Sequence, residues 1–176
     1  MDGGQNVIDA YFESFASQKT LADKAVAQVS DEDLRRSLGG DTNSIAVIMK
    51  HVAGNLRSRF TDFLYSDGEK PWRNRDEEFI DRYQKRDEIA ADWEEGWGVL
   101  FAALGGLTPE NLYANVAIRG QPHTVPLALD RSLAHIGYHT GQIVLTAKLL
   151  CAERWKTITV PRGGTKEHNR ALGFER

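Results

Sequence analysis

Four long segments of the chain repeat their apolar residues at helical spacing, and this periodicity limits the chain to a mainly helical fold. In the first segment, residues 6–29, apolar side chains recur at offsets of four, eight, fifteen, nineteen and twenty-two, which places them on one helical face. This face comprises Val7, Tyr11, Phe15, Ala22, Val26 and Val29. We expect three further helices at about residues 44–65, 87–104 and 126–152, so the pattern predicts an all-α four-helix bundle.

The connections between these helices differ in length and character. Residues 66–86 hold 12 charged residues among 21, and long polar connections of this kind usually carry function or wrap the surface. Residues 115–119 and 123–125 flank Gly120 and predict a short β-hairpin inserted before the fourth helix. The tail, residues 155–176, has no helical period, so we expect a loop that packs across the bundle.

Composition and charge exclude several classes of protein. Lys and Arg number 22 against 25 Asp and Glu, and this net charge of -3 does not favour nucleic-acid binding. The longest uncharged run, residues 132–147, contains two histidines and is shorter than the roughly 20 residues of a membrane span. Cys151 is the single cysteine, which rules out an intramolecular disulfide. We therefore expect a cytoplasmic protein of one domain, residues 1–176, without a nucleic-acid or membrane partner.

Three of the five histidines lie where a helical bundle would bring them together. His135 and His139 stand four residues apart on the fourth helix, so their Cβ atoms lie about 5–6 Å apart on one face. On this otherwise apolar helix they form a polar line with Ser132, Gln142 and Thr146. His51 lies in the middle of the second helix, and facing helices of a bundle can direct three such side chains to one point.

Two interpretations of these histidines are open from the residues alone. One is a pair of hydrogen-bonded core histidines, with His51 alone on the surface. The other is a metal site, in which three imidazoles leave coordination positions for water or substrate, as in catalytic centres. Imidazole ligands suit zinc, nickel, copper and iron, and the affinity order does not choose between these metals.

A few other side chains have chemistry of their own. Cys151 lies near the end of an apolar helix and is expected to be a buried structural thiol rather than a nucleophile. Arg119, Arg131 and His123 lie around the expected hairpin. They either bind an anionic substrate or form surface salt bridges, and the salt bridges are the simpler interpretation. His168 in the tail is expected to be solvated.

The segments around the three histidines resemble those of a known group of proteins. Residues 44–55, with His51, and residues 133–143, with His135 and His139, are similar to the two histidine-bearing helices of the DinB-like superfamily, also called the YfiT-like metalloenzymes. Three more segments resemble one bacterial branch of it, known chiefly as a domain of unknown function: residues 62–64, 67–73 and 158–163. The likeness extends over most of the chain, about residues 7–169.

This resemblance implies a four-helix bundle of the DinB-like type, with a divalent metal held by three histidines. The ligands it implies here are His51, His135 and His139, and zinc or nickel is the expected ion. Some relatives are thiol-dependent S-transferases or isomerases that use a low-molecular-weight thiol as cosubstrate. We therefore expect a metal-dependent transferase or hydrolase that acts on a small-molecule substrate, with the metal activating a thiol or water. The alternative is a non-catalytic metal-binding or stress-related protein on the same bundle.

A homodimer is expected as well, both from the resemblance and from the aromatic residues of the first and third helices. The core of one four-helix bundle does not easily hold this many aromatic side chains. They are Tyr11, Phe12, Phe15, Trp93, Trp97 and Phe101. Light scattering at high protein concentration measures the assembly, and a mass near the 19.7 kDa of one chain would contradict the dimer.

Overall fold

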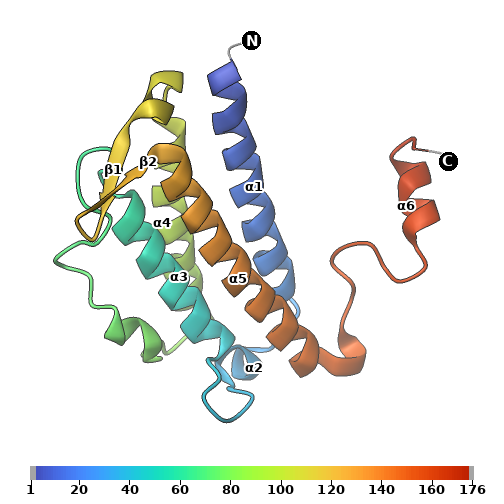
Figure 1. Cartoon of the computed structure of the whole chain (residues 1–176). Helices are drawn as coiled ribbons and strands as arrows, with labels where there is room; N and C mark the ends of the chain where they lie inside the picture. The colour runs from blue at the N-terminus through green and yellow to red at the C-terminus, as the bar shows by residue number, and fades with distance from the viewer. Residues whose placement is uncertain (1–2, 175–176) are drawn as a thin grey trace.

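The four expected helices are present in the computed structural model, which describes residues 3–174 (Figure 1). They are α1 (Gly3–Val26), α3 (Ile45–Phe60), α4 (Arg86–Gly105) and α5 (Val125–Cys151). An antiparallel hairpin of two strands, β1 (Asn115–Ile118) and β2 (Gln121–Thr124), precedes α5. The all-α fold with a short β insertion is therefore confirmed, and residues 1–2 and 175–176 of the expected domain lie outside the described residues.

Short helices lie between the long ones or after the last of them. They are α2 (Asp31–Arg35), the 3₁₀ helices η1 (Asp76–Phe79), η2 (Pro109–Tyr113) and η3 (Ala152–Arg154), and α6 (Thr165–Ala171). Polar side chains cap the two helices that carry the histidines: Ser44 accepts the backbone N–H of Val47 at the start of α3, and Thr124 accepts that of Leu127 at the start of α5. None of the helices formed by residues 3–174 has the length and apolar character needed to cross a lipid bilayer.

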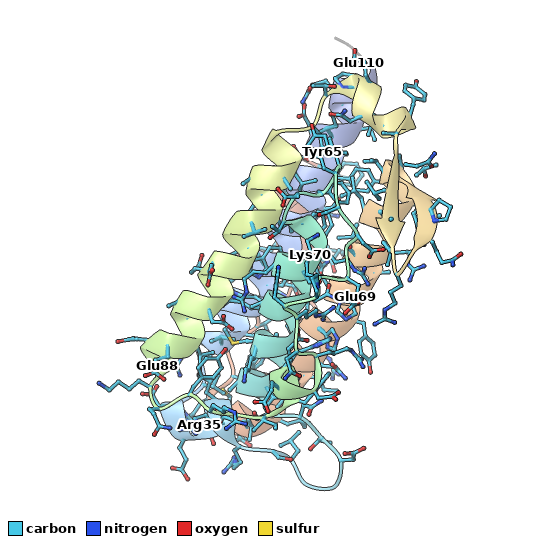
Figure 2. The ribbon with its side chains drawn as sticks, turned by 90° about the vertical axis from the view of Figure 1, so that its left-hand side faces the viewer. Arg35, Tyr65, Glu69, Lys70, Glu88 and Glu110 are labelled. Atoms are coloured by element: carbon cyan, nitrogen blue, oxygen red, sulfur yellow. The ribbon has the colours of Figure 1, made fainter. Side chains whose placement is uncertain are left out.

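The helices α3 and α4 run in the same direction, so the chain must return along the bundle between them (Figure 1). The connection, residues 61–85, makes this return along α3, against which η1 packs. Figure 2 shows its path from Tyr65 past Lys70 and Glu69 towards Glu88 at the start of α4. The polar segment therefore covers one side of α3, the helix that carries His51.

Asp67 ties this connection to the hairpin. Its carboxylate accepts the backbone N–H groups of Glu69, Arg119 and Gly120 at distances of 2.6–2.8 Å. These hydrogen bonds, that of Gly120 first, hold the pKa of Asp67 below its usual value. Arg119 and Gly120 have φ angles of 54° and 71°, the left-handed conformation that a two-residue hairpin turn requires. The turn is thereby fixed beside the connection.

Close packing of α3 against α4 supports the core. Gly96 on α4 permits this approach, because a Cβ atom there would lie 2.7 Å from the Cα of Ala53 on α3. Trp97 is fully buried beside this contact, and its ring centroid lies 5.4 Å from that of Trp93 and 5.6 Å from that of Phe101. The helix that carries His51 is therefore held rigidly on one side.

One residue of the expected apolar face of α1 lies outside it. Val7 is 41% exposed, and Ile8 is buried in its place. Ile8 lies three residues before Tyr11 and Val7 lies four residues before it, and both spacings belong to one helical face. The periodicity therefore could not choose between the two positions.

The expectation of a loop that packs across the bundle was wrong for the end of the tail. Residues 165–171 form α6, which has no buried residue and stands apart from the bundle in Figure 1. Good helix formers such as Lys166, Glu167 and Ala171 favour this helix without any apolar period. The beginning of the tail packs on the core, through the half-buried Trp155 and Ile158.

More of the six aromatic side chains of α1 and α4 are buried within a single chain than we expected. Phe15, Trp93 and Trp97 are buried within it, and Tyr11 and Phe101 are half-buried. Phe12 is 43% exposed, although its ring centroid lies 4.9 Å from that of Phe101. The homodimer stays a prediction.

Candidate metal centre

His51 on α3 and His135 and His139 on α5 converge at one point. The Nε2 atom of His135 lies 3.2 Å from Nε2 of His51 and 3.1 Å from Nε2 of His139, and the ligand atoms of all three residues lie within 4.8 Å of one another. His51 and His139 are buried, and His135 is half-buried. Two nitrogen ligands about 2.0–2.1 Å from one zinc ion lie about 3.3 Å apart at a tetrahedral angle. The spacing therefore suits a shared ion.

Two of the rings are held by hydrogen bonds at their outer nitrogens. Nδ1 of His51 donates to Oε2 of Glu78, and Nδ1 of His139 donates to Oε1 of Gln142, both at 2.8 Å. Gln142 is fixed in turn, because its Nε2 donates to the hydroxyl of Tyr138 at 3.1 Å. A neutral ring with its proton on Nδ1 has a lone pair on Nε2, which is the form that binds a metal.

His135 tests whether the cluster fits a cation. Its Nδ1 is buried and has no hydrogen-bond partner among the described residues. Its Nε2 faces the Nε2 lone pairs of the two other rings. A proton on Nε2 of His135 could form a good hydrogen bond with only one of these two acceptors. Buried polar atoms stay unsatisfied in either tautomer, at a cost of about 1–3 kcal/mol for each group. A cation that accepts all three Nε2 lone pairs removes their conflict, so this donor set fits one divalent ion.

Glu78 is the negatively charged partner of the cluster. Burial alone would raise the pKa of Glu78, but hydrogen bonds from His51 and Arg73 outweigh burial and bring this pKa below its usual value. Arg73 donates to both carboxylate oxygens, at 2.8 and 3.0 Å. Glu78 is therefore ionised, orients the ring of His51 and adds a negative charge near any cation bound at Nε2.

The 3₁₀ helix η1 forms one wall of the site. The ring of Phe79 stacks on that of His51 with centroids 4.7 Å apart, and Glu78 precedes it in the chain. Lys50 on α3 fixes η1 in place, because its Nζ donates to the carbonyl oxygens of Glu77 and Ile80, both at 2.8 Å. The long polar connection is therefore part of the site.

The site opens on one side to a cavity of about 170 Å³. His51 and His135 lie in its wall, together with Asn55 and Ser132. Within residues 3–174, the group of neighbouring ligand atoms at this point holds the three histidines and no carboxylate or thiol. Three protein ligands with an open side are the arrangement of catalytic rather than structural zinc sites.

Gly54 makes room for Glu78, and replacing it by Ala should weaken metal binding. A Cβ atom at Gly54 would lie 2.5 Å from Oε1 of Glu78, so the carboxylate must move. We expect Gly54→Ala to lower the affinity for Zn²⁺ by about 10- to 100-fold, because the hydrogen bond that orients His51 is disturbed. Competition with a chromophoric chelator measures this change.

Gly98→Ala is the matched control, because a Cβ atom at this exposed helical glycine meets nothing within 4 Å. It should leave the Zn²⁺ affinity unchanged and raise the free energy of unfolding by about 0.5–1 kcal/mol. Equal Zn²⁺ affinities of Gly54→Ala and the original protein would contradict the role of Glu78.

The metal-free protein should lose stability in mild acid. Burial first, and then the neighbouring charges of His139 and His51, lower the pKa of His135 from 6.5 to about 3. The unfolded chain takes up a proton at this residue as the pH falls below about 6.5, but the folded chain does so only near pH 3. The contribution of His135 to stability is therefore full above pH 6.5 and is lost as the pH falls towards 3, by at most about 1.4 kcal/mol per pH unit.

Urea unfolding in the presence of a chelator, between about pH 7.5 and about pH 5, measures this dependence. His135→Gln removes the titrating group and should reduce the loss of stability in acid. The same pH dependence in the variant would assign the effect to other groups.

Of the residues expected around the hairpin, only Arg119 forms one of the expected salt bridges among the described residues, and the binding of an anionic substrate stays a prediction. Arg119 forms a salt bridge with Glu69 at 3.1 Å, and Arg131 instead donates from Nη1 to Nε2 of His123 at 2.8 Å. His123 is buried, and its Nε2 accepts this hydrogen bond, so the single ring proton is on Nδ1, which donates to the carbonyl oxygen of Gln121 at 2.9 Å. Both arginines line the cavity beside the histidine cluster.

Cys151 and His168 lie away from this cluster. Cys151 is buried, and its Sγ lies 3.2 Å from the carbonyl oxygen of Gln28, as suits a structural thiol. His168 is exposed on α6.

Sequence reasoning missed several residues of the site. Asn55 and Arg59 follow His51 at intervals of four on α3, and both line the cavity. Such a polar row on an apolar helix is the signal that identified the line on α5, so it could have found them. Arg73 and Glu78 lie in the connection, where no periodicity indicates which side chains turn inward.

The fold and the histidine cluster together define an all-α protein with three histidines placed closely enough to hold one metal ion. Over residues 2–164 the sequence matches the family model described as a protein of unknown function (DUF1572), and the chain belongs to this family. No curated protein and no solved structure matches the chain significantly.

Proposed function

We propose that the protein binds one divalent metal ion, zinc or nickel, through His51, His135 and His139, and that it is a metal-dependent enzyme of the DinB-like superfamily. The observation that supports this most strongly is the convergence of three Nε2 atoms whose rings point their lone pairs at one another. The oriented Nδ1 partners of His51 and His139 support it further. The sequence resemblance supports the superfamily.

The proposed reaction is the transfer of a group to a low-molecular-weight thiol, or a hydrolysis. The ion would supply a Lewis acid that lowers the pKa of a thiol or water. Glu78 and Gln142 would keep the ligand rings in the metal-binding tautomer throughout. Asn55 and Ser132 would offer hydrogen bonds to a small-molecule substrate in the cavity.

The cavity favours an enzyme over the alternative, a non-catalytic metal-binding or stress-related protein. A stabilising or sensing site is expected to have a closed shell of protein ligands. The side of the cluster that meets the cavity leaves space for an exchangeable ligand. The cytoplasmic location and the homodimer remain predictions from the sequence.

Metal analysis followed by an activity screen tests this proposal. The purified protein should contain close to one zinc or nickel ion per chain. The loaded protein should then turn over a pairing of a thiol with an electrophile, from a panel that includes bacillithiol and mycothiol. Full metal content without turnover of any pairing would count against thiol transfer, and absence of bound metal would contradict both the enzyme and the non-catalytic metal-binding protein.

A further inference from the structure

The cavity beside the three histidines is lined by five arginines. Arg59 comes from α3, Arg73 and Arg75 from the connection, Arg119 from the hairpin turn and Arg131 from α5. Separate segments of the chain thus bring guanidinium groups to a space of about 170 Å³. None of the described residues that line this space is acidic.

Carboxylates balance only two of these five charges. Arg73 pairs with Glu78 at 2.8 Å and with Glu69 at 3.7 Å. Glu69 also pairs with Arg119, at 3.1 Å. Both carboxylates are therefore already engaged outside the wall of the cavity.

The other three arginines, within residues 3–174, have no carboxylate partner. The guanidinium of Arg75 lies 5.6 Å from the ring centroid of Phe79, and Arg131 donates to the neutral ring of His123. Three positive charges thus face the cavity without a salt bridge to a described carboxylate, although Glu69 attracts Arg59 from a greater distance. His123 acts here as a positioning residue, because its hydrogen bond fixes the guanidinium of Arg131 without balancing the positive charge.

Arg59 shows most directly that the cavity suits an anion. Its Nη1 atom is buried and has no hydrogen-bond partner among the described residues. Burial first, and then the charges of Arg73, Arg119 and Arg131, outweigh the attraction of Glu69 and hold the pKa of Arg59 below its usual value. Burial of a charged guanidinium is costly, and an anion in the cavity that Arg59 lines would offset that cost and the repulsion from the other arginines.

We propose that this cavity binds a doubly charged oxyanion group, a phosphate monoester or a dicarboxylate, that belongs to the small-molecule substrate. Guanidinium forks match the oxygen spacing of both groups. His51 and His135 line the same cavity, so the bound group lies next to the three Nε2 atoms. The assignment of the anion to the substrate rests on the proposed function, whereas its binding in the cavity does not.

Calorimetric titration of the full chain with inorganic phosphate and with malonate tests the proposal, after treatment with a chelator and at constant ionic strength. One of the two dianions should bind with a Kd below about 1 mM. Tighter phosphate binding would indicate a phosphate ester, and tighter malonate binding a dicarboxylate. Malonamide has a similar shape without charge and should not bind.

Two substitutions locate the binding. Arg59→Gln and Arg131→Gln should each weaken the affinity for the dianion by at least about tenfold, because each removes a hydrogen bond to a charged group. Arg154→Gln is the control, because the side chain of Arg154 is 66% exposed and does not line the cavity. The affinity of this variant for the dianion should equal that of the original protein. If Arg59→Gln does not fold, Arg59→Lys keeps the charge without the fork and should still weaken binding.

Two results would overturn the proposal: an original protein that binds neither dianion at millimolar concentration, or binding that neither Arg59→Gln nor Arg131→Gln weakens. Metal uptake is measured separately, on samples of the same proteins to which Zn²⁺ is added back, and should be equal in all arginine variants. An original protein that takes up no metal but still binds the dianion would count against the proposed function alone.

Discussion

Replacing His51, His135 or His139 singly by Ala is expected to lower the affinity for Zn²⁺ by more than about a hundredfold. Loss of a partner that only orients a ligand already costs about 10- to 100-fold, and loss of a ligand itself costs more. Chelator competition on the purified variants measures the affinity. The fold should survive, because a chain of 176 residues buries its own core and does not depend on the ion as a zinc finger does.

The remaining histidines are the controls for these three variants. His123→Ala and His168→Ala should keep close to one ion per chain, because neither ring belongs to the cluster. The three ligand variants should also lose the stabilisation that bound metal gives the folded state. Full metal content in His51→Ala with loss of metal in His123→Ala would show that the ligand assignment is wrong.

Replacing Trp97 by Ala is expected to lower the free energy of unfolding by about 3–5 kcal/mol. Trp97 is the largest of the fully buried side chains, and its removal leaves a cavity next to the close contact of Gly96 with Ala53. That contact fixes α3, so the affinity for metal should fall as well. Chemical denaturation with and without Zn²⁺ measures both effects.

Two further tryptophan variants control for the type of residue. Trp97→Phe should cost less than Trp97→Ala, because it keeps most of the volume and also removes the buried Nε1 donor, which has no partner among the described residues. Trp72→Ala changes a side chain that is 57% exposed and should alter stability by less than about 0.5 kcal/mol. Equal losses for Trp97→Ala and Trp72→Ala would contradict the position of the core.

The long helices could be predicted from the sequence because their apolar faces face one another in the core. In the third helix the spacing predicts one apolar stripe of six residues: Ile89, Trp93, Trp97, Leu100, Phe101 and Leu104. Five of them are buried on α4, and Phe101 is half-buried. This signal depends on burial, so it failed where burial is absent. The helix α6 is exposed along its length and left no apolar period to detect.

The residues of the candidate site also divide into those that the sequence could predict and those that it could not. His135 and His139 could be paired from their spacing alone, because helix geometry fixes the positions of residues four apart. Their proximity to His51 required the packing of α3 against α5, which the resemblance implied and the spacing did not. Glu78 could not be predicted, because it lies in an irregular connection whose path is set by long-range contacts such as that of Asp67 with the hairpin turn.

The most direct test of the account is a crystal structure of the zinc-loaded protein, with anomalous scattering recorded at the zinc absorption edge. The account predicts one strong anomalous peak per chain, about 2.0–2.1 Å from Nε2 of His51, His135 and His139, with a water or small molecule completing the coordination on the side of the cavity. A peak held by other residues, or a fourth protein ligand that closes the site, would contradict the open three-histidine centre.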